Sequence, residues 1–115
     1  IMGISYKPNV KDVQLSPAKN IIKKFQNLGS DVHIYDPFFK STEIFGIKVC
    51  DDFENILSEM DAVVIVTGHD EFKQIELTSF TKIKSKILID SRGIIDPNHI
   101  KNKNLIFRGL GRGNF

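Results

Sequence analysis

Short apolar runs alternate with amphipathic stretches along the chain, a pattern typical of proteins that alternate strands and helices. The runs at 1–5 (Ile-Met-Gly-Ile-Ser) and 61–67 (Asp-Ala-Val-Val-Ile-Val-Thr) carry no polar alternation. Such runs predict strands covered on both faces, as in the middle of a parallel sheet. The run at 61–67 is the stronger and predicts the central strand. Gly3 predicts a close approach by a helix or another backbone.

The clearest helix signal lies between these two runs. Ser16 is a favourable N-cap residue, Pro17 suits the first helical position, and Gly29 suits the end of a helix. The apolar residues between them recur at helical spacing and predict one buried stripe. They are Ala18, Ile21, Ile22, Phe25 and Leu28.

Weaker patterns predict the remaining elements. Further strands are predicted at 31–35 (near the sheet edge), 46–50, 86–90 and 105–108. Further helices are predicted from Asp51 or Asp52 to Met60, over Phe72 to Phe80, and around Pro97 to Ile100. Because strands and helices alternate throughout, the predicted fold class is α/β, a three-layer sandwich with a mostly parallel, Rossmann-like sheet. Residues 1–115 are expected to form a single domain.

Composition narrows the possible functions. The chain has 115 residues, of which 41% are hydrophobic and 26% charged, so one well-packed domain is expected. A net charge of +2, evenly spread, argues against nucleic acid as a partner. No apolar run approaches the roughly 18 residues of a membrane helix, so no membrane association and a cytoplasmic location are expected. The chain begins at Ile1 in strand-like residues, which we interpret as a domain cut from a longer protein; a trimmed disordered start is the alternative.

Single polar residues give few chemical signals. Cys50 is the only cysteine, which excludes an internal disulfide and a cysteine-based zinc site, and it is interpreted as a small buried residue. The three histidines show no metal-ligand spacing, so no metal is expected. His69 is predicted to cap the helix that follows it, with a ligand contact as the alternative. Asp36 is predicted to form a turn ahead of Pro37, with a ribose contact as the alternative.

Four polar segments follow predicted strands. They are Tyr6-Lys7, Asp36-Pro37, Gly68-His69 and Ser91-Arg92. Carboxyl ends of parallel strands share one edge, where ligands usually bind. Lys7 and Arg92 are therefore predicted to converge on an anion, for which phosphate is the natural candidate; two solvated loop cations are the alternative. The loop at 6–15 exceeds the usual length of about 2–6 residues, which favours a functional role. No G-x-G-x-x-G or P-loop motif is present, so NAD or ATP binding by this domain alone has no motif support.

The opening stretch Gly-Ile-Ser-Tyr-Lys-Pro-Asn at 3–9, with Asp12 and then Ser-Pro-Ala at 16–18, resembles a known family. It is similar to the C-terminal, UDP-binding domain of nucleotide-sugar 6-dehydrogenases, the enzymes that act on UDP-glucose, UDP-N-acetylmannosamine and GDP-mannose. Further landmarks agree in order along essentially the whole chain. They are the segments 32–37, 66–72, 90–92 (Asp-Ser-Arg) and 109–113.

The resemblance implies a fragment of an enzyme that oxidises the C6 alcohol of a UDP-sugar to a carboxylate by two hydride transfers to NAD. It implies that NAD is bound by an N-terminal domain missing here, that a missing cysteine motif carries the second oxidation, and that the parent enzyme is a homodimer or larger homo-oligomer. The isolated domain is then expected to be inactive, with no catalytic residue of its own.

Three residues of this chain match substrate contacts of the family. Tyr6 and Lys7 match its aromatic–lysine pair, and Arg92 matches the arginine of its Asp-x-Arg turn. Gln14 departs from the pattern, because many members have an arginine there, near the NAD phosphates. The amino-acid sequences of these motifs resemble more closely those of the enzymes that act on N-acetylated sugars, such as UDP-N-acetylmannosamine or UDP-N-acetylglucosamine. The alternative to the whole interpretation is a stand-alone, non-catalytic module for nucleotide sensing or protein interaction.

Overall fold

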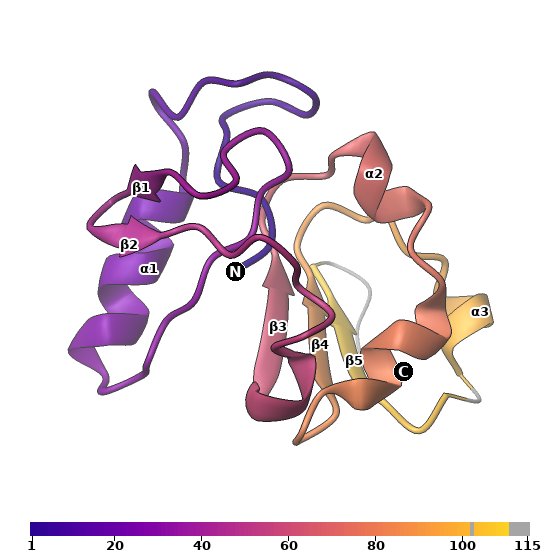
Figure 1. Ribbon diagram of the computed structural model, residues 1–115. Helices are drawn as coiled ribbons and strands as arrows, with labels where there is room; N and C mark the ends of the chain where they lie inside the picture. Colours follow the sequence, from indigo (N-terminus) through magenta and orange to yellow (C-terminus); the bar gives the residue numbers. More distant parts are fainter. Residues whose placement is uncertain (102, 111–115) are drawn as a thin grey trace.

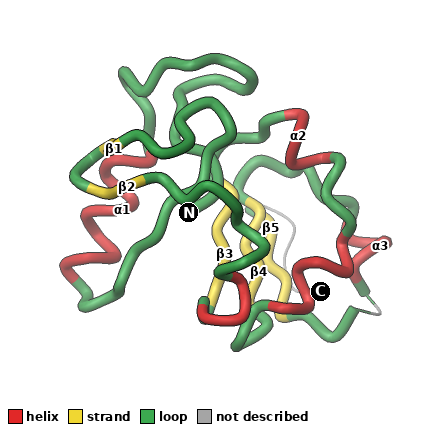
Figure 2. Tube along the Cα trace, viewed as in Figure 1, coloured by secondary structure: helices red, strands yellow, loops and turns green. Residues whose placement is uncertain are grey.

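The computed structural model describes residues 1–101 and 103–110, and Figure 1 shows the course of the chain. The helices are α1 (Ala18–Asn27), α2 (Asp70–Lys73) and α3 (Pro97–Ile100), and the 3₁₀ helices are η1 (Leu57–Glu59) and η2 (Leu77–Lys82). The strands are β1 (Glu43–Ile44), β2 (Ile47–Lys48), β3 (Ala62–Ile65), β4 (Ile87–Asp90) and β5 (Ile106–Gly109). Much of the remaining chain is loop (Figure 2).

The main sheet is parallel and β3 lies near its middle. Strands β3, β4 and β5 are neighbours in that order. Met2 extends the sheet by forming parallel bridges to Ile65 of β3 and to Tyr35. The predicted strands at 1–5 and 31–35 are therefore extended segments of the sheet, each reduced to one bridging residue. The central position predicted for 61–67 and the edge position predicted for 31–35 are both confirmed.

Helices cover the two faces of this sheet. Val63 and Ile65 of β3 face a core cluster that also contains Phe80 of η2 and Ile100 of α3. Val66, just after β3, faces a second cluster that contains Ala18 and Ile22 of α1. In Figure 1, α1 accordingly lies on one side of the strands, with η2 and α3 on the other. The predicted three-layer α/β fold is thereby confirmed.

Helix α1 is the best predicted element, with small changes at its ends. It begins at Ala18, and the Ser16 hydroxyl accepts a hydrogen bond from the Ala18 N–H at 3.1 Å. The side chain of Leu28 is 82% exposed, so its assignment to the buried stripe was wrong. The helix ends at Asn27, and Leu28 still donates its N–H to the Lys24 carbonyl at 3.1 Å as the C-cap residue. At about 100° per residue, Leu28 lies roughly 120° around the helix from the buried Ile22, which places it beyond the margin of the buried stripe.

Two predicted helices are much shorter in the structure. The segment from Asp52 to Met60 forms only η1, although the Asp52 carboxylate accepts the Glu54 N–H at 3.0 Å as a helix start would. The segment from Phe72 to Phe80 is split into α2 and η2. Ile75 and Leu77 are two residues apart, and one continuous helix would point them about 200° apart. The break allows both to pack against the same core cluster.

The strand predicted at 46–50 is present as the shorter β2, which forms an unpredicted β-hairpin with β1. Strands β1 and β2 pair antiparallel across the turn at Phe45 and Gly46, whose φ values are 53° and 79°. Two positive φ values are the geometry of a tight hairpin turn, which glycine favours. The hairpin forms a second, two-stranded sheet beside α1 (Figure 1).

Gly3 confirms the predicted close approach. Its φ is +88°, and a Cβ at this position would lie 2.5 Å from the Cβ of Thr67. The approaching partner is thus the segment that continues β3. Strands β4 and β5 and helix α3 confirm the predicted strands at 86–90 and 105–108 and the predicted helix at 97–100. The landmark at 109–113 lies outside the described residues from 111 onward. Within the described part of the chain, no helix has the length and apolarity needed to cross a bilayer.

Candidate functional site at the carboxyl ends of the strands

Three strand ends meet at one edge of the main sheet. The Thr67 hydroxyl donates to the Ser5 carbonyl at 2.7 Å, which joins the end of the first segment to the end of β3. The Ser91 N–H donates to the Ile65 carbonyl at 3.1 Å and joins β4 to β3 in the same way. A Cβ placed on Gly68 would lie 3.6 Å from the Cβ of Arg92. The loops that carry Lys7 and Arg92 therefore flank the same segment.

The predicted binding side chains on this edge are exposed. Lys7 and Arg92 are both exposed, and Tyr6 is 47% exposed. The Lys7 Nζ lies 6.0 Å from the centroid of the Tyr6 ring, within cation–π range. Within residues 1–101 and 103–110, neither Lys7 nor Arg92 forms an ion pair. Both charges are thus free, among these residues, to meet an external anion.

Asp90 builds the turn that presents Arg92. One carboxylate oxygen of Asp90 accepts the N–H groups of Arg92 at 3.0 Å and Gly93 at 2.9 Å. The other oxygen accepts the Ile95 N–H at 2.8 Å. Asp90 is fully buried, so its role is to shape the turn. An aspartate at a strand end, three residues before a glycine, was the available signal for this role.

His69 is part of a buried network. Its side chain is 0% exposed and makes no capping bond to α2, so the predicted capping role was wrong, as was the alternative of a ligand contact. Its Nδ1 accepts the Asn9 N–H at 2.8 Å. Since an N–H only donates, the ring proton must be on Nε2, which donates to Asp36 Oδ2 at 2.8 Å. The Asn9 side chain caps α2 instead, accepting the Asp70 N–H at 2.9 Å.

Asp36 uses both carboxylate oxygens inside the protein. Its Oδ1 accepts the Phe38 N–H at 2.9 Å, which confirms the predicted turn ahead of Pro37. Its Oδ2 accepts the Ile4 N–H at 2.9 Å in addition to the His69 bond. This fully buried carboxylate is not available to a ribose.

The network does not form a catalytic triad. The Ser5 hydroxyl lies 3.3 Å from His69 Nε2, the same nitrogen that contacts Asp36. In a serine hydrolase the serine and the aspartate bind opposite ring nitrogens, and the serine is accessible to the substrate. Ser5, Asp36 and His69 are all buried, so none of them is accessible to a substrate as a catalytic group.

The edge does not fit a dinucleotide cofactor. In a dinucleotide fold the first strand leads through glycines directly to a helix N-terminus, which binds the pyrophosphate. Here Gly3 is packed against Thr67, and α1 begins only at Ala18, after a long loop. No group of three or more potential metal ligands is found within the described residues.

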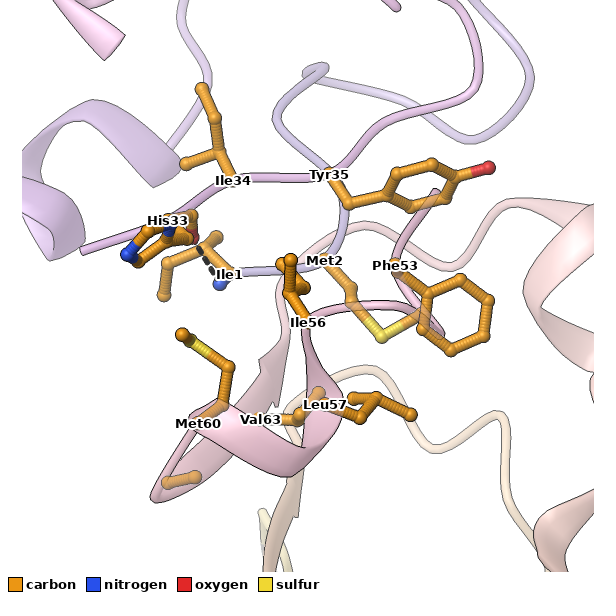
Figure 3. Close-up of a pocket in the computed structure, with 11 residues that line it drawn as sticks. Ile1, Met2, His33, Ile34, Tyr35, Phe53, Ile56, Leu57, Met60 and Val63 are labelled. Atoms are coloured by element: carbon orange, nitrogen blue, oxygen red, sulfur yellow. Dashed lines mark hydrogen bonds between the residues drawn. The ribbon is translucent and has the colours of Figure 1, made fainter. Parts of the chain in front are cut away.

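Two hollows lie at the opposite, amino-terminal ends of the strands. The cavity in Figure 3 measures about 30 Å³ and is lined by residues such as Met2, His33 and Met60. That volume holds about one water molecule. A neighbouring open groove of about 550 Å³ runs past Leu28 and Asp61. Tyr6, Lys7 and Arg92 line neither of these two hollows, and all three side chains are exposed.

Three titratable groups that lie outside the candidate site have pKa values shifted by burial. When Ile1 is the first residue of the chain, its amine donates to the His33 carbonyl at 2.8 Å (Figure 3), and burial lowers the pKa of this amine to about 6. Burial is the main cause that raises the pKa of the Tyr35 hydroxyl, and the hydrogen bond to Glu71 raises it further. Burial also raises the pKa of the half-buried Cys50 thiol, the opposite of what an activated nucleophile requires.

An α/β domain with an exposed cationic loop surface at the carboxyl ends of its strands is thus the class that the fold and the site define. The chain belongs to the UDP-glucose/GDP-mannose dehydrogenase family, UDP binding domain, whose family model matches residues 1–97.

Named relatives agree with this assignment. The chain is 35% identical to the UDP-N-acetyl-D-mannosamine dehydrogenase of Pyrococcus horikoshii, over 98% of the chain and 25% of that protein. It is 31% identical to UDP-glucose 6-dehydrogenase TuaD of Bacillus subtilis, over 97% of the chain and 25% of that protein. The chain therefore spans about a quarter of the length of these relatives.

Solved structures show the same fold. A structure of the Pyrococcus horikoshii UDP-D-ManNAc dehydrogenase superposes with a TM-score of 0.82 at 32% identity, over 99% of the chain and 25% of that protein. An NDP-N-acetyl-D-galactosaminuronic acid dehydrogenase from Methanosarcina mazei superposes with a TM-score of 0.84 at 23% identity, over 96% of the chain and 24% of that protein, a likeness of fold alone.

Proposed function

We propose that residues 1–115 form the UDP-sugar-binding domain of an NAD-dependent nucleotide-sugar 6-dehydrogenase, which oxidises the C6 alcohol of its substrate to a carboxylate. Membership of the family and the names of the relatives support this proposal. The structural observation behind it is that the Lys7 and Arg92 loops flank one segment, Thr67–Gly68, with both cations unpaired among the described residues.

Each binding residue has a distinct role in this proposal. Arg92 and Lys7 neutralise the diphosphate, the arginine as a two-pronged donor and the lysine as a point charge. Tyr6 packs against the sugar nucleotide or bonds to it. Exposed binding side chains suit half of a site, completed by another part of the parent enzyme. That part also supplies the catalytic cysteine. It binds NAD as well, since the loop after the first strand of this chain does not fit a dinucleotide. The parent enzyme is a homo-oligomer.

The substrate is proposed to be an N-acetylated UDP-sugar, UDP-N-acetylmannosamine or UDP-N-acetylglucosamine. The support is the name of the Pyrococcus horikoshii relative. Because the match to a UDP-glucose 6-dehydrogenase is similar, UDP-glucose is the alternative substrate to test. The test is kcat/KM of the full-length enzyme with each of the three UDP-sugars. A preference for UDP-glucose would contradict the substrate assignment and leave the proposed domain function standing.

Titration of the full-length enzyme with UDP tests the binding role. A charge-assisted hydrogen bond contributes about 1.5–3 kcal/mol, so Lys7→Ala is expected to weaken UDP binding roughly 10- to 100-fold. Lys19→Ala is the matched control, because Lys19 is an exposed lysine on α1. Unchanged UDP affinity in Lys7→Ala would refute the proposed site.

Calorimetry of the 115-residue chain alone separates the proposal from a stand-alone sensor. A severed half-site is expected to bind UDP weakly and NAD not at all. UDP binding as tight as that of the full-length enzyme would favour the sensor.

A further inference from the structure

The loop that carries Tyr6 and Lys7 has exposed side chains but a fixed backbone. Every residue from Tyr6 to Asp12 is exposed, so packing of its own side chains does not hold this Lys7 loop (residues 6–12) in place. Hydrogen bonds do. The Tyr6 N–H donates to the Asp12 carbonyl at 2.9 Å, and the Ser5 hydroxyl donates to the Lys7 carbonyl at 2.8 Å. A third bond joins the loop to the core, from the Asn9 N–H to His69.

Asn9 is a well-defined anchor point two residues after Lys7. Its φ is 62°, a left-handed conformation that asparagine tolerates better than most residues. Its backbone N–H donates to His69 Nδ1, and its side-chain Oδ1 accepts the Asp70 N–H. Both bonds lead to the segment that follows β3, so they fix the direction of the chain at Asn9.

The His69 ring is itself fixed in one orientation. The rings of Phe38 and Phe72 lie 4.9 Å and 5.3 Å from it, measured between centroids. Asp36 accepts the Nε2 proton, which leaves the Nδ1 lone pair directed at Asn9. The same carboxylate oxygen accepts the Ile4 N–H, just before the loop. The buried pair of Asp36 and His69 thus holds the loop both at its start and at Asn9.

We propose that His69 is a positioning residue for UDP-sugar binding. Its neutral imidazole, oriented by Asp36, fixes Asn9 and thereby holds Tyr6 and Lys7 toward the substrate. His69 is fully buried and does not contact the substrate itself. This inference rests on the proposed function, which assigns Tyr6 and Lys7 to the UDP-sugar.

Two substitutions in the full-length enzyme separate the two ring nitrogens. Asparagine places its amide near the Nδ1 position and can supply an acceptor for the Asn9 N–H, whereas glutamine places its amide near Nε2 and can donate to Asp36. His69→Gln is therefore expected to raise the KM for UDP-sugar and the Kd for UDP about 3- to 10-fold, the loss of one hydrogen bond, with little change in kcat. His69→Asn is expected to keep both constants near the wild-type values.

Hydrogen–deuterium exchange gives a readout that does not depend on the ligand. His69→Gln is expected to accelerate exchange in the peptide that covers residues 5–12, and His69→Asn is not. Equal KM increases in both variants, in proportion to their loss of thermal stability, would show a merely structural role and overturn the proposal. Unchanged loop exchange in His69→Gln would overturn it as well.

Failure of this inference is distinguishable from failure of the proposed function. If Lys7→Ala leaves UDP affinity unchanged, the proposed function is wrong whatever the exchange of the loop. If Lys7→Ala weakens binding and His69→Gln does not, only the positioning role is wrong.

Should a His69 variant fail to fold, Asn9→Ala tests the same contact through the exposed residue Asn9. Alanine disfavours the left-handed φ and removes the bond to Asp70, so weaker UDP binding is expected, and wild-type affinity would refute the role of the anchor.

Discussion

Asp36 and His69 lie 33 positions apart in the sequence, yet their side chains meet at 2.8 Å with no exposure to solvent. The contact joins the end of the Tyr35 segment to the end of β3. Asp36 also accepts the N–H groups of Ile4 and Phe38, so one carboxylate serves three donors. Together these bonds join the extended segments that contain Met2 and Tyr35 to the end of β3, at the edge where the candidate site lies.

Removal of the Asp36 carboxylate is expected to destabilise the domain strongly. Asp36→Ala leaves three donors without their acceptor, and each unsatisfied buried donor costs about 1–3 kcal/mol, so a loss of more than about 3 kcal/mol is expected. Asp36→Asn keeps one acceptor oxygen and is expected to cost less. Chemical denaturation of the chain measures both losses. Asp31→Asn is the control, because the Asp31 side chain is 93% exposed. A loss in Asp36→Ala no larger than in this control would contradict the role of the network.

Gly3 is expected to tolerate no side chain. Gly3→Ala combines a φ of +88° with a Cβ only 2.5 Å from the Thr67 Cβ. Gly29→Ala is a matched control, since Gly29 has a φ of +91° and a Cβ added there would meet nothing within 4 Å. The control is expected to cost about 1–2 kcal/mol for the left-handed backbone. Gly3→Ala is expected to cost about 1–3 kcal/mol more, because the sheet must open to relieve the overlap. Equal losses of thermal stability would show that Thr67 moves aside freely.

The fold and the site differ in how far the sequence predicts them. The run at 61–67 and the spacing in α1 are local patterns, and each predicted its element because burial on the sheet imposes the pattern directly. The bond between Asn9 and His69 spans 60 positions and has no local pattern. A histidine before a short helix carries the same local signal whether it caps that helix or turns inward, so its role in the network was missed. The turn at Phe45 and Gly46 was missed because phenylalanine rarely occupies a positive φ.

The Ile1 amine is expected to make stability depend on pH when Ile1 is the first residue of the chain. Burial lowers its pKa in the folded state from 8.0 to about 6. Between these values the unfolded chain binds more protons than the folded chain, so stability rises as the pH increases from 6 to 8. Two pKa units correspond to about 2–3 kcal/mol, which is fully lost below pH 6. Melting temperatures at pH 5.5, 7 and 8.5 measure the effect.

Acetylation of the amine supplies the control for this pH dependence. An acetylated Ile1 keeps an N–H that can donate to His33 but no longer titrates. The difference in melting temperature between the free and the acetylated chain is expected to be large at pH 5.5 and to disappear at pH 8.5. A difference that does not change with pH would refute a buried, titrating amine.

Leu28 and Ile22 provide the sharpest test of which residues of the predicted stripe are buried. Both are large apolar residues of the predicted stripe, but Leu28 is 82% exposed and Ile22 only 2% exposed. Ile22→Ala is expected to destabilise the chain by about 2–5 kcal/mol, because it leaves a cavity between α1 and the sheet. Leu28→Ala is expected to change stability by less than about 0.5 kcal/mol, as surface substitutions usually do. Denaturant unfolding of both variants compares the two losses directly. Similar losses in the two variants would mean that Leu28 is covered in solution, which would place it back on the buried stripe that the sequence predicted.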